Sequence, residues 1–328
     1  MAAKLQGTQA SSMVSSPITG WLFPGQGSQY LGMGRDLWAR AGRPLEIVEE
    51  AEHVSGFPLR QLSLQGPSDE LTRTDVLQPA LTAISLGCMH LLREAGFQPD
   101  MVAGHSLGEF AALCAAGVFG VSECLRLVTE RSRLMQNVAQ HLDGGMGAVK
   151  RVTPEQLAEV VAAHAPGVSI ANWNSPDQIV VSGPNAALAL LGPPITTAGG
   201  EFIPLPVAGP WHHPSMEEAA AAFRQVVTET TFLAPRCPVF MNVSAAGEAD
   251  PLQIKGLVKL QMTSPVLWQA SIEAMFAAGA GLFLEVGPGK VLRGLMRRII
   301  PDESTYRMRG IENQRSLQFL KTETPVSC

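Results

Sequence analysis

Short apolar runs and helical periodicities alternate over the first 140 residues of the chain. The strand-like runs are 18–23 and 101–104, and each leads into a turn that contains glycine. Helical patterns cover 41–54, 78–95, 107–116 and 122–140, with Ser122 as the expected N-cap of the last. Because strands that alternate with helices form βαβ units, this part of the sequence predicts an α/β fold with a mainly parallel sheet.

The pattern changes after His141, where short strand-like runs dominate. We expect strands at 144–151, 168–171, 178–182 and 201–205, helices at 154–164 and 185–191, and a loop at 172–177. This β-α-β-β-α-β order is the split βαβ arrangement and predicts a small inserted domain. We therefore divide the chain into a flexible leader at 1–17, a large domain at 18–142 and 207–315, a small domain at 143–206 and a tail at 316–328.

Composition narrows the class of protein. Of the 328 residues, 46% are hydrophobic and 16% are charged, which excludes a disordered chain and a coiled coil. The chain has 24 basic and 29 acidic residues, so its formal net charge is -5. Since proteins that bind duplexes usually carry a basic excess, we expect no nucleic-acid partner.

Cysteine usage and the leader bear on location. The five cysteines are widely spaced and form no CxxC pair, so we expect neither a zinc ribbon nor a thioredoxin-like site. We expect the protein to work in a reducing compartment. The leader has no apolar core of the kind that a secretory signal needs. No stretch of 18 uncharged apolar residues occurs later, so we expect no membrane span and a cytoplasmic protein.

The sequence Gly104-His105-Ser106-Leu107-Gly108 fits the pattern G-x-S-x-G. The glycines permit a sharp turn from strand to helix that lifts the serine hydroxyl out at the end of the strand. The start of the following helix directs backbone N–H groups and a positive dipole at the same point. A simple turn that happens to contain serine is the alternative, but the strand before it and the helix after it favour Ser106 as a nucleophile.

A serine nucleophile needs a base, and the chain has seven histidines. His212 and His213 lie in a loop at the expected domain junction, just before a helix that opens with Pro214. The pattern alone does not choose between them, and His213 also fits an N-cap position. His105 adjoins Ser106, but neighbouring side chains at such a turn point apart.

Arg131 lies on the apolar stripe of the helix at 122–140, where it is out of place. A buried structural ion pair is the ordinary explanation for such a residue. The functional explanation is a clamp for a carboxylate, because guanidinium binds a carboxylate through two parallel hydrogen bonds. The glycine-rich loop at 23–29 fits neither a P-loop nor a dinucleotide fingerprint, so we do not expect it to cradle phosphate.

Four motifs stand in order along the chain: Phe23-Pro-Gly-Gln-Gly-Ser-Gln29, Gly104-His-Ser-Leu-Gly-Glu109, Arg131-Ser-Arg-Leu-Met-Gln136 and Glu285-Val-Gly-Pro-Gly-Lys290. Together they resemble the malonyl-CoA:acyl carrier protein transacylase family, which includes stand-alone enzymes of fatty-acid synthesis and acyltransferase units of polyketide synthases. The resemblance covers residues 18–315. It implies an α/β-hydrolase-like large domain with an inserted ferredoxin-like small domain.

The resemblance also implies roles for individual residues. Ser106 is similar to the acyl nucleophile, and His212, four residues before a methionine, to its base. Arg131 is similar to the clamp for the malonyl carboxylate. The resemblance further implies that the backbone amides of Gln26 and Leu107 form the oxyanion hole, that the backbone carbonyl of Gln261 orients the histidine, and that Gln78 and Asn172 lie near the pocket.

The implied reaction moves malonyl from malonyl-CoA to the phosphopantetheine thiol of an acyl carrier protein, through a malonyl-serine intermediate and with ping-pong kinetics. We expect no metal and no cofactor, no nucleic acid or membrane partner, and a monomer. A hydrolase of editing type is one alternative, although such relatives tend to lack the clamp arginine. A non-catalytic scaffold that binds the carrier is another, and the joint presence of the site residues argues against it.

Two features qualify this expectation. Trp211 stands before His212, where malonyl-selective polyketide units carry phenylalanine and methylmalonyl-selective ones carry serine. The bulk of the indole suggests little room for an α-branch, so malonyl is the first choice and an unusual α-substituted extender unit is the alternative. Arg293, Arg297 and Arg298 form a candidate basic patch for the carrier protein, with solvated charges on a helix face as the alternative.

Overall fold

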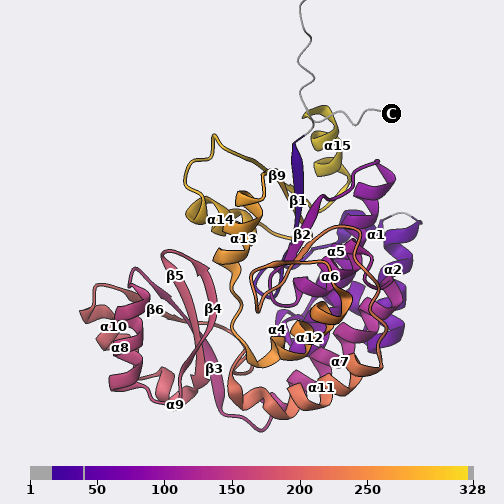
Figure 1. Cartoon of the computed structure of the whole chain (residues 1–328). Helices are drawn as coiled ribbons and strands as arrows, with labels where there is room; N and C mark the ends of the chain where they lie inside the picture. The colour runs from indigo at the N-terminus through magenta and orange to yellow at the C-terminus, as the bar shows by residue number, and fades with distance from the viewer. Residues whose placement is uncertain (1–16, 40, 324–328) are drawn as a thin grey trace, which may run out of the picture.

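The computed structural model describes residues 17–39 and 41–323. The expected leader at 1–17, apart from Pro17, and the last five residues of the expected tail at 316–328 lie outside the described residues. The described chain forms two β-sheets with helices packed on them (Figure 1).

The larger sheet has six strands in the order β10-β9-β1-β2-β7-β8. All neighbours in it are parallel except β7 and β8, which confirms a mixed α/β fold with a mainly parallel sheet. Its strands are β1 (Ile18–Phe23), β2 (Met101–Gly104), β7 (Val239–Phe240), β8 (Gly247–Glu248), β9 (Ala280–Val286) and β10 (Arg307–Ile311).

Successive side chains of a strand point to opposite faces, so the apolar strands of this sheet present two apolar faces. Helices cover both of them. Trp21 and Phe23 of β1 pack in one apolar cluster with α5 (Thr74–Glu94) and α6 (Gly108–Ala116). Leu22 packs in a second cluster with α13 (Trp268–Ala277) and α14 (Val291–Ile299). The other helices of this part are α1 (Arg35–Trp38), α2 (Arg43–Ser55), α3 (Leu59–Gln65), α4 (Ser68–Thr72), α7 (Val121–Ala139), α11 (Glu217–Glu229), α12 (Pro251–Leu260) and α15 (Gln314–Glu323), with short 3-10 turns η1 (Pro214–Met216) and η2 (Gln261–Thr263).

The central helix α5 is long and apolar enough to cross a membrane by length and composition alone. Of its most apolar 18-residue window, 89% is buried inside the fold. Its neighbours are α2 and α7, so the apolar surface of α5 forms part of the protein core.

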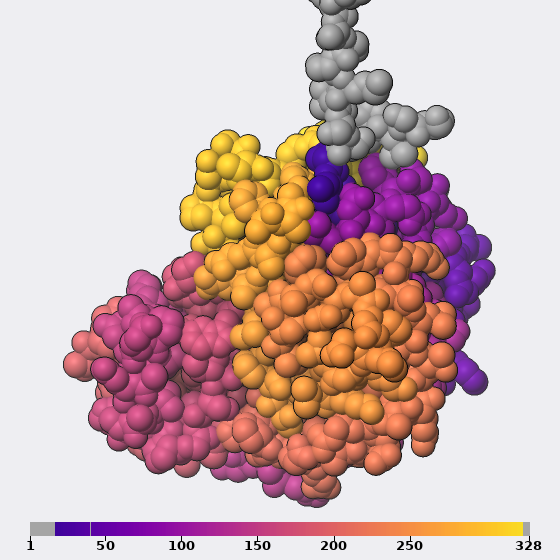
Figure 2. All heavy atoms as spheres, viewed as in Figure 1, coloured from indigo at the N-terminus to yellow at the C-terminus, as the bar shows by residue number. Residues whose placement is uncertain are grey.

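The smaller sheet is antiparallel, with the order β4-β5-β3-β6. It is built from β3 (Gly144–Lys150), α8 (Pro154–His164), β4 (Ser169–Ser175), β5 (Gln178–Pro184), α9 (Asn185–Leu188), α10 (Gly192–Thr197) and β6 (Glu201–Pro204). A separate apolar cluster lies between this sheet and its helices. The space-filling view shows this segment as a lobe beside the larger body (Figure 2). Backbone hydrogen bonds join β4 to the larger body, where Trp173 N donates to Val266 O and Val266 N donates to Ala171 O.

Two local expectations were wrong. Ser122 is not the N-cap of α7, because Gly120 has extended backbone there and the helix begins at Val121. The expected loop at 172–177 is shorter, since β4 continues through Ser175 and pairs with β5. Within the expected tail, residues 316–323 belong to α15, which buries Leu317 and Leu320.

Candidate active site

Ser106 lies in a tight turn between the end of β2 and the start of α6. Its backbone has φ 49°, a left-handed conformation that is strained for a residue with a side chain. The flanking glycines are required sterically. A Cβ at Gly104 would lie 2.0 Å from the backbone of Gly108, and a Cβ at Gly108 would lie 2.0 Å from the carbonyl oxygen of Phe23. The turn therefore packs directly on the end of β1.

His212 is the histidine that the fold brings to this serine. Its Nε2 lies 2.7 Å from Ser106 Oγ, and its Nδ1 lies 3.0 Å from the carbonyl oxygens of both Gln261 and Ser264. Because two carbonyl acceptors face Nδ1, that nitrogen carries the proton and Nε2 is free to accept one from the hydroxyl. Burial, with the charge of Arg131 second, lowers the pKa of His212 to about 3. The ring is therefore neutral at physiological pH, as a base must be.

The neighbouring histidines have other partners. His213 Nε2 lies 2.8 Å from the carbonyl oxygen of Gly167, and its Nδ1 accepts from Ser215 N at the start of η1. The N-cap alternative for His213 is thus confirmed. His105 Nε2 lies 2.8 Å from Asn174 Oδ1, and its ring meets the ring of Trp268 edge-on.

We expect His212→Ala to lose most of the rate of Ser106 acylation, by about a hundredfold or more, because general-base catalysis contributes on that order. His213→Ala is the matched control, and we expect it to cost far less, since its ring faces Gly167 and Ser215. Rates of acylation by a thioester substrate, measured for both variants, check this expectation. A larger loss for His213→Ala would show that the wrong histidine is assigned as base.

Arg131 comes from α7, and its side chain is 1% exposed. Its Nη1 donates to Gln78 Oε1 at 2.8 Å, its Nε and Nη2 donate to Gln261 Oε1 at 3.2 and 3.1 Å, and its Nη2 lies 3.4 Å from Ser106 Oγ. Burial lowers its pKa to about 10, so it remains charged at neutral pH. Among the described residues no carboxylate forms an ion pair with Arg131, so the structural ion-pair alternative is wrong.

Two backbone amides near Ser106 have free donors. Gln26 lies in the turn after β1, and Leu107 follows Ser106 at the start of α6. Within the described part of the chain, neither amide donates a backbone hydrogen bond. The side chain of Gln26 is held by Gln78 Nε2, which donates to its Oε1 at 2.9 Å. The structure thus leaves both amides available to an oxyanion at this turn.

A cavity of about 220 Å³ opens beside Ser106 and His212. Strands of the smaller sheet contribute to its wall, Asn172 among them, and helices and loops contribute the rest, Trp211 among them. Gln78 is not part of this wall, but its Oε1 accepts from Arg131 Nη1. The indole of Trp211 is buried against the cavity. The other apolar lining residues are Leu77, Met135, Met146, Val180, Leu205, Val207, Val291, Leu292 and Leu295.

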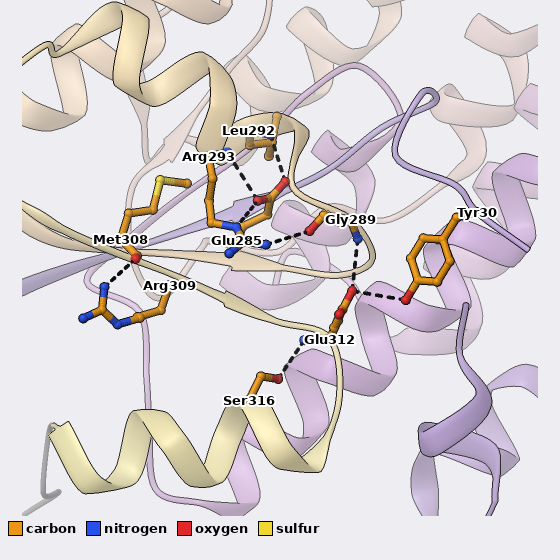
Figure 3. Close-up of polar contacts among 9 residues, drawn as sticks. All are labelled: Tyr30, Glu285, Gly289, Leu292, Arg293, Met308, Arg309, Glu312 and Ser316. Atoms are coloured by element: carbon orange, nitrogen blue, oxygen red, sulfur yellow. Dashed lines mark hydrogen bonds and ion pairs between the residues drawn. The ribbon is translucent and has the colours of Figure 1, made fainter. Parts of the chain in front are cut away.

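The motif at 285–290 anchors the helix that walls one side of this cavity (Figure 3). The buried Glu285 carboxylate accepts from Leu292 N, from Arg293 N and from Arg293 Nε, which fixes the first turn of α14. Nearby, Glu312 accepts from Gly289 N and from the hydroxyl of Tyr30. These contacts tie α14 and the loop before it to the segment that follows the Gln26 turn.

The candidate basic patch does not form as expected. Each of its three arginines is paired with a carboxylate, so the patch carries less net positive charge than its sequence indicates. The pairs are Arg293 with Glu285, Arg297 with Glu303, and Arg298 with Asp177. The alternative of charges on a solvated helix face describes these residues better.

Sequence reasoning missed several polar residues around the dyad. Ser264 supplies the second carbonyl to His212, and Asn242 Oδ1 accepts from Ser106 N at 2.7 Å. Glu109, inside the quoted motif 104–109, is fully buried and holds the side chain of Gln261. An acidic residue inside an otherwise apolar helix was a signal for Glu109; Ser264 and Asn242 had no local signal. Among the described residues no group of three or more His, Cys, Asp or Glu side chains is placed to hold a metal ion.

Comparisons with known proteins agree with this geometry. The model of the acyl transferase domain family matches residues 20–323. A relative from Salmonella typhimurium named malonyl CoA-acyl carrier protein transacylase is 38% identical over 284 residues, which cover 85% of this chain and 92% of that protein. The structure of an acyl carrier protein S-malonyltransferase from Vibrio cholerae is 37% identical and superposes with a TM-score of 0.86, covering 93% of this chain and 100% of that one.

A further solved structure contains a carrier protein. It is described as a holo type II polyketide synthase acyl carrier protein in complex with its malonyl-transacylase. The transacylase is 34% identical to this chain, with a TM-score of 0.88, and the match covers 93% of this chain and 99% of that one.

Proposed function

Since the chain belongs to the acyl transferase domain family, we propose that it is a malonyl-CoA:acyl carrier protein transacylase that works through a malonyl ester of Ser106. It is an acyltransferase enzyme, and its partner is an acyl carrier protein. The relatives do not favour the alternatives of a hydrolase or of an enzyme for an unusual α-substituted extender unit.

One observation carries the choice of a dicarboxylic acyl group. Arg131 is a charged guanidinium that is 1% exposed and lies 3.4 Å from the nucleophilic oxygen. Its other hydrogen-bond partners are two neutral side-chain amide oxygens. A buried charge without a bonded counter-ion is costly. The free carboxylate of a malonyl group supplies that counter-ion, because it forms two parallel charge-assisted hydrogen bonds with a guanidinium. An acetyl group offers nothing comparable.

The acylation half of the reaction follows from the dyad. His212 Nε2 takes the proton of Ser106 Oγ, and the oxygen attacks the thioester carbonyl of malonyl-CoA. The amides of Gln26 and Leu107 stabilise the tetrahedral oxyanion, each by about 2.7–4 kcal/mol. When the intermediate collapses, the C–S bond breaks and the CoA sulfur takes the proton from His212. The carbonyls of Gln261 and Ser264 hold the imidazolium meanwhile, in the place of a triad aspartate.

The transfer half runs the same steps with a new nucleophile. His212 takes the proton of the phosphopantetheine thiol, and the sulfur attacks the malonyl ester carbonyl in the same oxyanion hole. The C–O bond breaks, and Ser106 recovers its proton from His212. The indole of Trp211 lies against the cavity and leaves little room for a bulky acyl group. This supports malonyl over acyl groups with an α-branch.

We also propose that the chain has two domains of known architecture. The small sheet has the order β4-β5-β3-β6 with helices after its first and third strands, which supports a ferredoxin-like domain at 143–206. The turn at Ser106 between a parallel strand and a helix supports an α/β-hydrolase-like large catalytic domain at 18–142 and 207–315. We further propose that the enzyme is cytoplasmic. We also propose that it is a monomer that needs no metal or cofactor, since one chain supplies every group used above.

The purified chain, radiolabelled malonyl-CoA and a phosphopantetheinylated acyl carrier protein test the proposal. We expect a covalent label on the enzyme that persists without carrier and moves to the carrier when it is added. Rapid release of free malonate without carrier would instead indicate a hydrolase. Absence of any label on the enzyme would contradict the covalent mechanism and leave a scaffold.

A further inference from the structure

Glu109 lies at the start of α6, three residues after the nucleophile, and is 0% exposed. Its Oε1 accepts from Asn242 N at 2.6 Å, and its Oε2 accepts from Gln261 Nε2 at 2.7 Å. These donors lie 133 and 152 residues away in the chain. A buried carboxylate with a neutral hydrogen-bond partner on each oxygen is costly to retain, and the mechanism above does not use it.

On one side, Glu109 supports the turn that carries the nucleophile. By accepting from Asn242 N, it fixes the backbone of that residue. The Asn242 side chain then accepts from Ser106 N at 2.7 Å and donates to Gly104 O at 2.6 Å. The left-handed backbone of Ser106 is thus held by an amide that Glu109 anchors.

On the other side, Glu109 sets the direction of the Gln261 side-chain amide. Gln261 Nε2 donates to Glu109 and to Ser106 O, so its Oε1 faces the Arg131 guanidinium. If the amide turned over, an oxygen would face the Glu109 carboxylate and an NH₂ group would face the guanidinium. Both contacts would be repulsive, because a carboxylate only accepts and a guanidinium only donates. The backbone of the same residue holds His212.

From this geometry, and resting on the function proposed above, we propose that Glu109 is the positioning residue of the acyl-binding site. It orients the Gln261 amide so that Arg131 is held ready for the malonyl carboxylate. Glu109 touches neither the substrate nor the dyad side chains and acts through Gln261 and Asn242.

Electrostatics are consistent with this role. Burial raises the pKa of Glu109 to about 7, although the hydrogen bonds from Asn242 and Gln261 and the charge of Arg131 each lower it. Burial lowers the pKa of Arg131, and the charge of Glu109 raises it. Glutamine has nearly the size and shape of glutamate and keeps one oxygen that can accept from Asn242 N, so it is a suitable neutral isostere at this position.

Glu109→Gln tests the proposal. The backbone N–H of Asn242 cannot turn away, so the new side-chain oxygen takes that donor and the new NH₂ faces Gln261. The Gln261 amide must then turn over and present its own NH₂ to Arg131. We expect kcat/KM for malonyl-CoA acylation to fall about tenfold to a hundredfold, while the value for acetyl-CoA falls much less. A merely structural role would lower both values alike, together with the melting temperature.

Gln261→Ala provides the second arm, because it removes the amide and keeps the backbone carbonyl that holds His212. If Glu109 acts through this amide, Gln261→Ala alone should lower the malonyl-to-acetyl ratio, and Glu109→Gln added to it should change the ratio by no more than about twofold. An unchanged ratio in both single variants, or fully additive effects in the double variant, overturns the positioning role. The wild type separates the two proposals, since its failure to form a malonyl adduct would contradict the function itself.

Discussion

We expect Ser106→Ala to abolish covalent acylation by malonyl-CoA, with turnover reduced by at least about a thousandfold, as for the loss of a nucleophile in other serine enzymes. The hydroxyl oxygen 2.7 Å from His212 Nε2 is the atom that forms the ester, and alanine offers no substitute. The fold should persist, because the change removes one oxygen from a turn that Asn242 and the glycine contacts hold in place.

Intact-protein mass measured after incubation with malonyl-CoA checks this result. Ser215→Ala is the matched control: this serine also lies beside a histidine, but that histidine is His213 and the site is exposed, so labelling should be normal. A Ser106→Ala variant that still gains a malonyl group would move the nucleophile to another residue.

The second large effect concerns Arg131→Ala. The substitution removes a charge-assisted, bidentate contact with the substrate carboxylate, and hydrogen bonds to charged groups contribute about 1.5–3 kcal/mol each. Malonyl-CoA kcat/KM should therefore fall by at least about tenfold to a hundredfold, because ~1.4 kcal/mol corresponds to a factor of ten. Acetyl-CoA has no carboxylate to lose, so its value should hold or rise, and the ratio of the two should collapse or invert.

Measuring kcat/KM for malonyl-CoA and for acetyl-CoA, together with the melting temperature, in the wild type and in Arg131→Ala checks this prediction. Arg126→Ala is the matched control on the same helix, since Arg126 pairs with Glu123 on the surface and should leave the ratio as it is. If Arg131→Ala lowered both substrates alike together with the melting temperature, Arg131 would be a packing residue, and the main argument for a dicarboxylic donor would fail.

The parts of this site that are local in sequence could be predicted. The run of apolar residues before Gly104, the turn and the helix after it follow from neighbouring residues, and the glycines have a steric requirement that the pattern expresses. The unusual position of Arg131 on an apolar stripe of its helix could likewise be predicted from the sequence, because it depends only on the helical period.

Other parts depend on contacts that no local pattern encodes. His212 and His213 have the same local surroundings, and only the tertiary fold turns the first towards Ser106 and the second towards Gly167. The side chain of Gln261 meets Glu109 across 152 residues. The prediction of Ser122 as the N-cap of α7 was wrong for a different reason. Serine is common near helix starts, and the extended backbone of Gly120 had no sequence signal.

The cavity beside Ser106 has one wall from the smaller sheet, whereas every group assigned to the chemistry lies on helices and loops outside that sheet. Met146, Asn172 and Val180 of the smaller sheet line this cavity, and the hydrogen bonds of Ser106 and His212 go to other residues. We expect substitutions of these side chains to change the shape of the cavity and to leave the hydrogen bonds between Ser106 and His212 in place. The carboxylate contact of Arg131 and the position of Trp211 stay with the reaction machinery, but the rest of the pocket shape has a separate genetic target, so evolution or an engineer can retune the fit of the acyl group while that machinery is inherited unchanged.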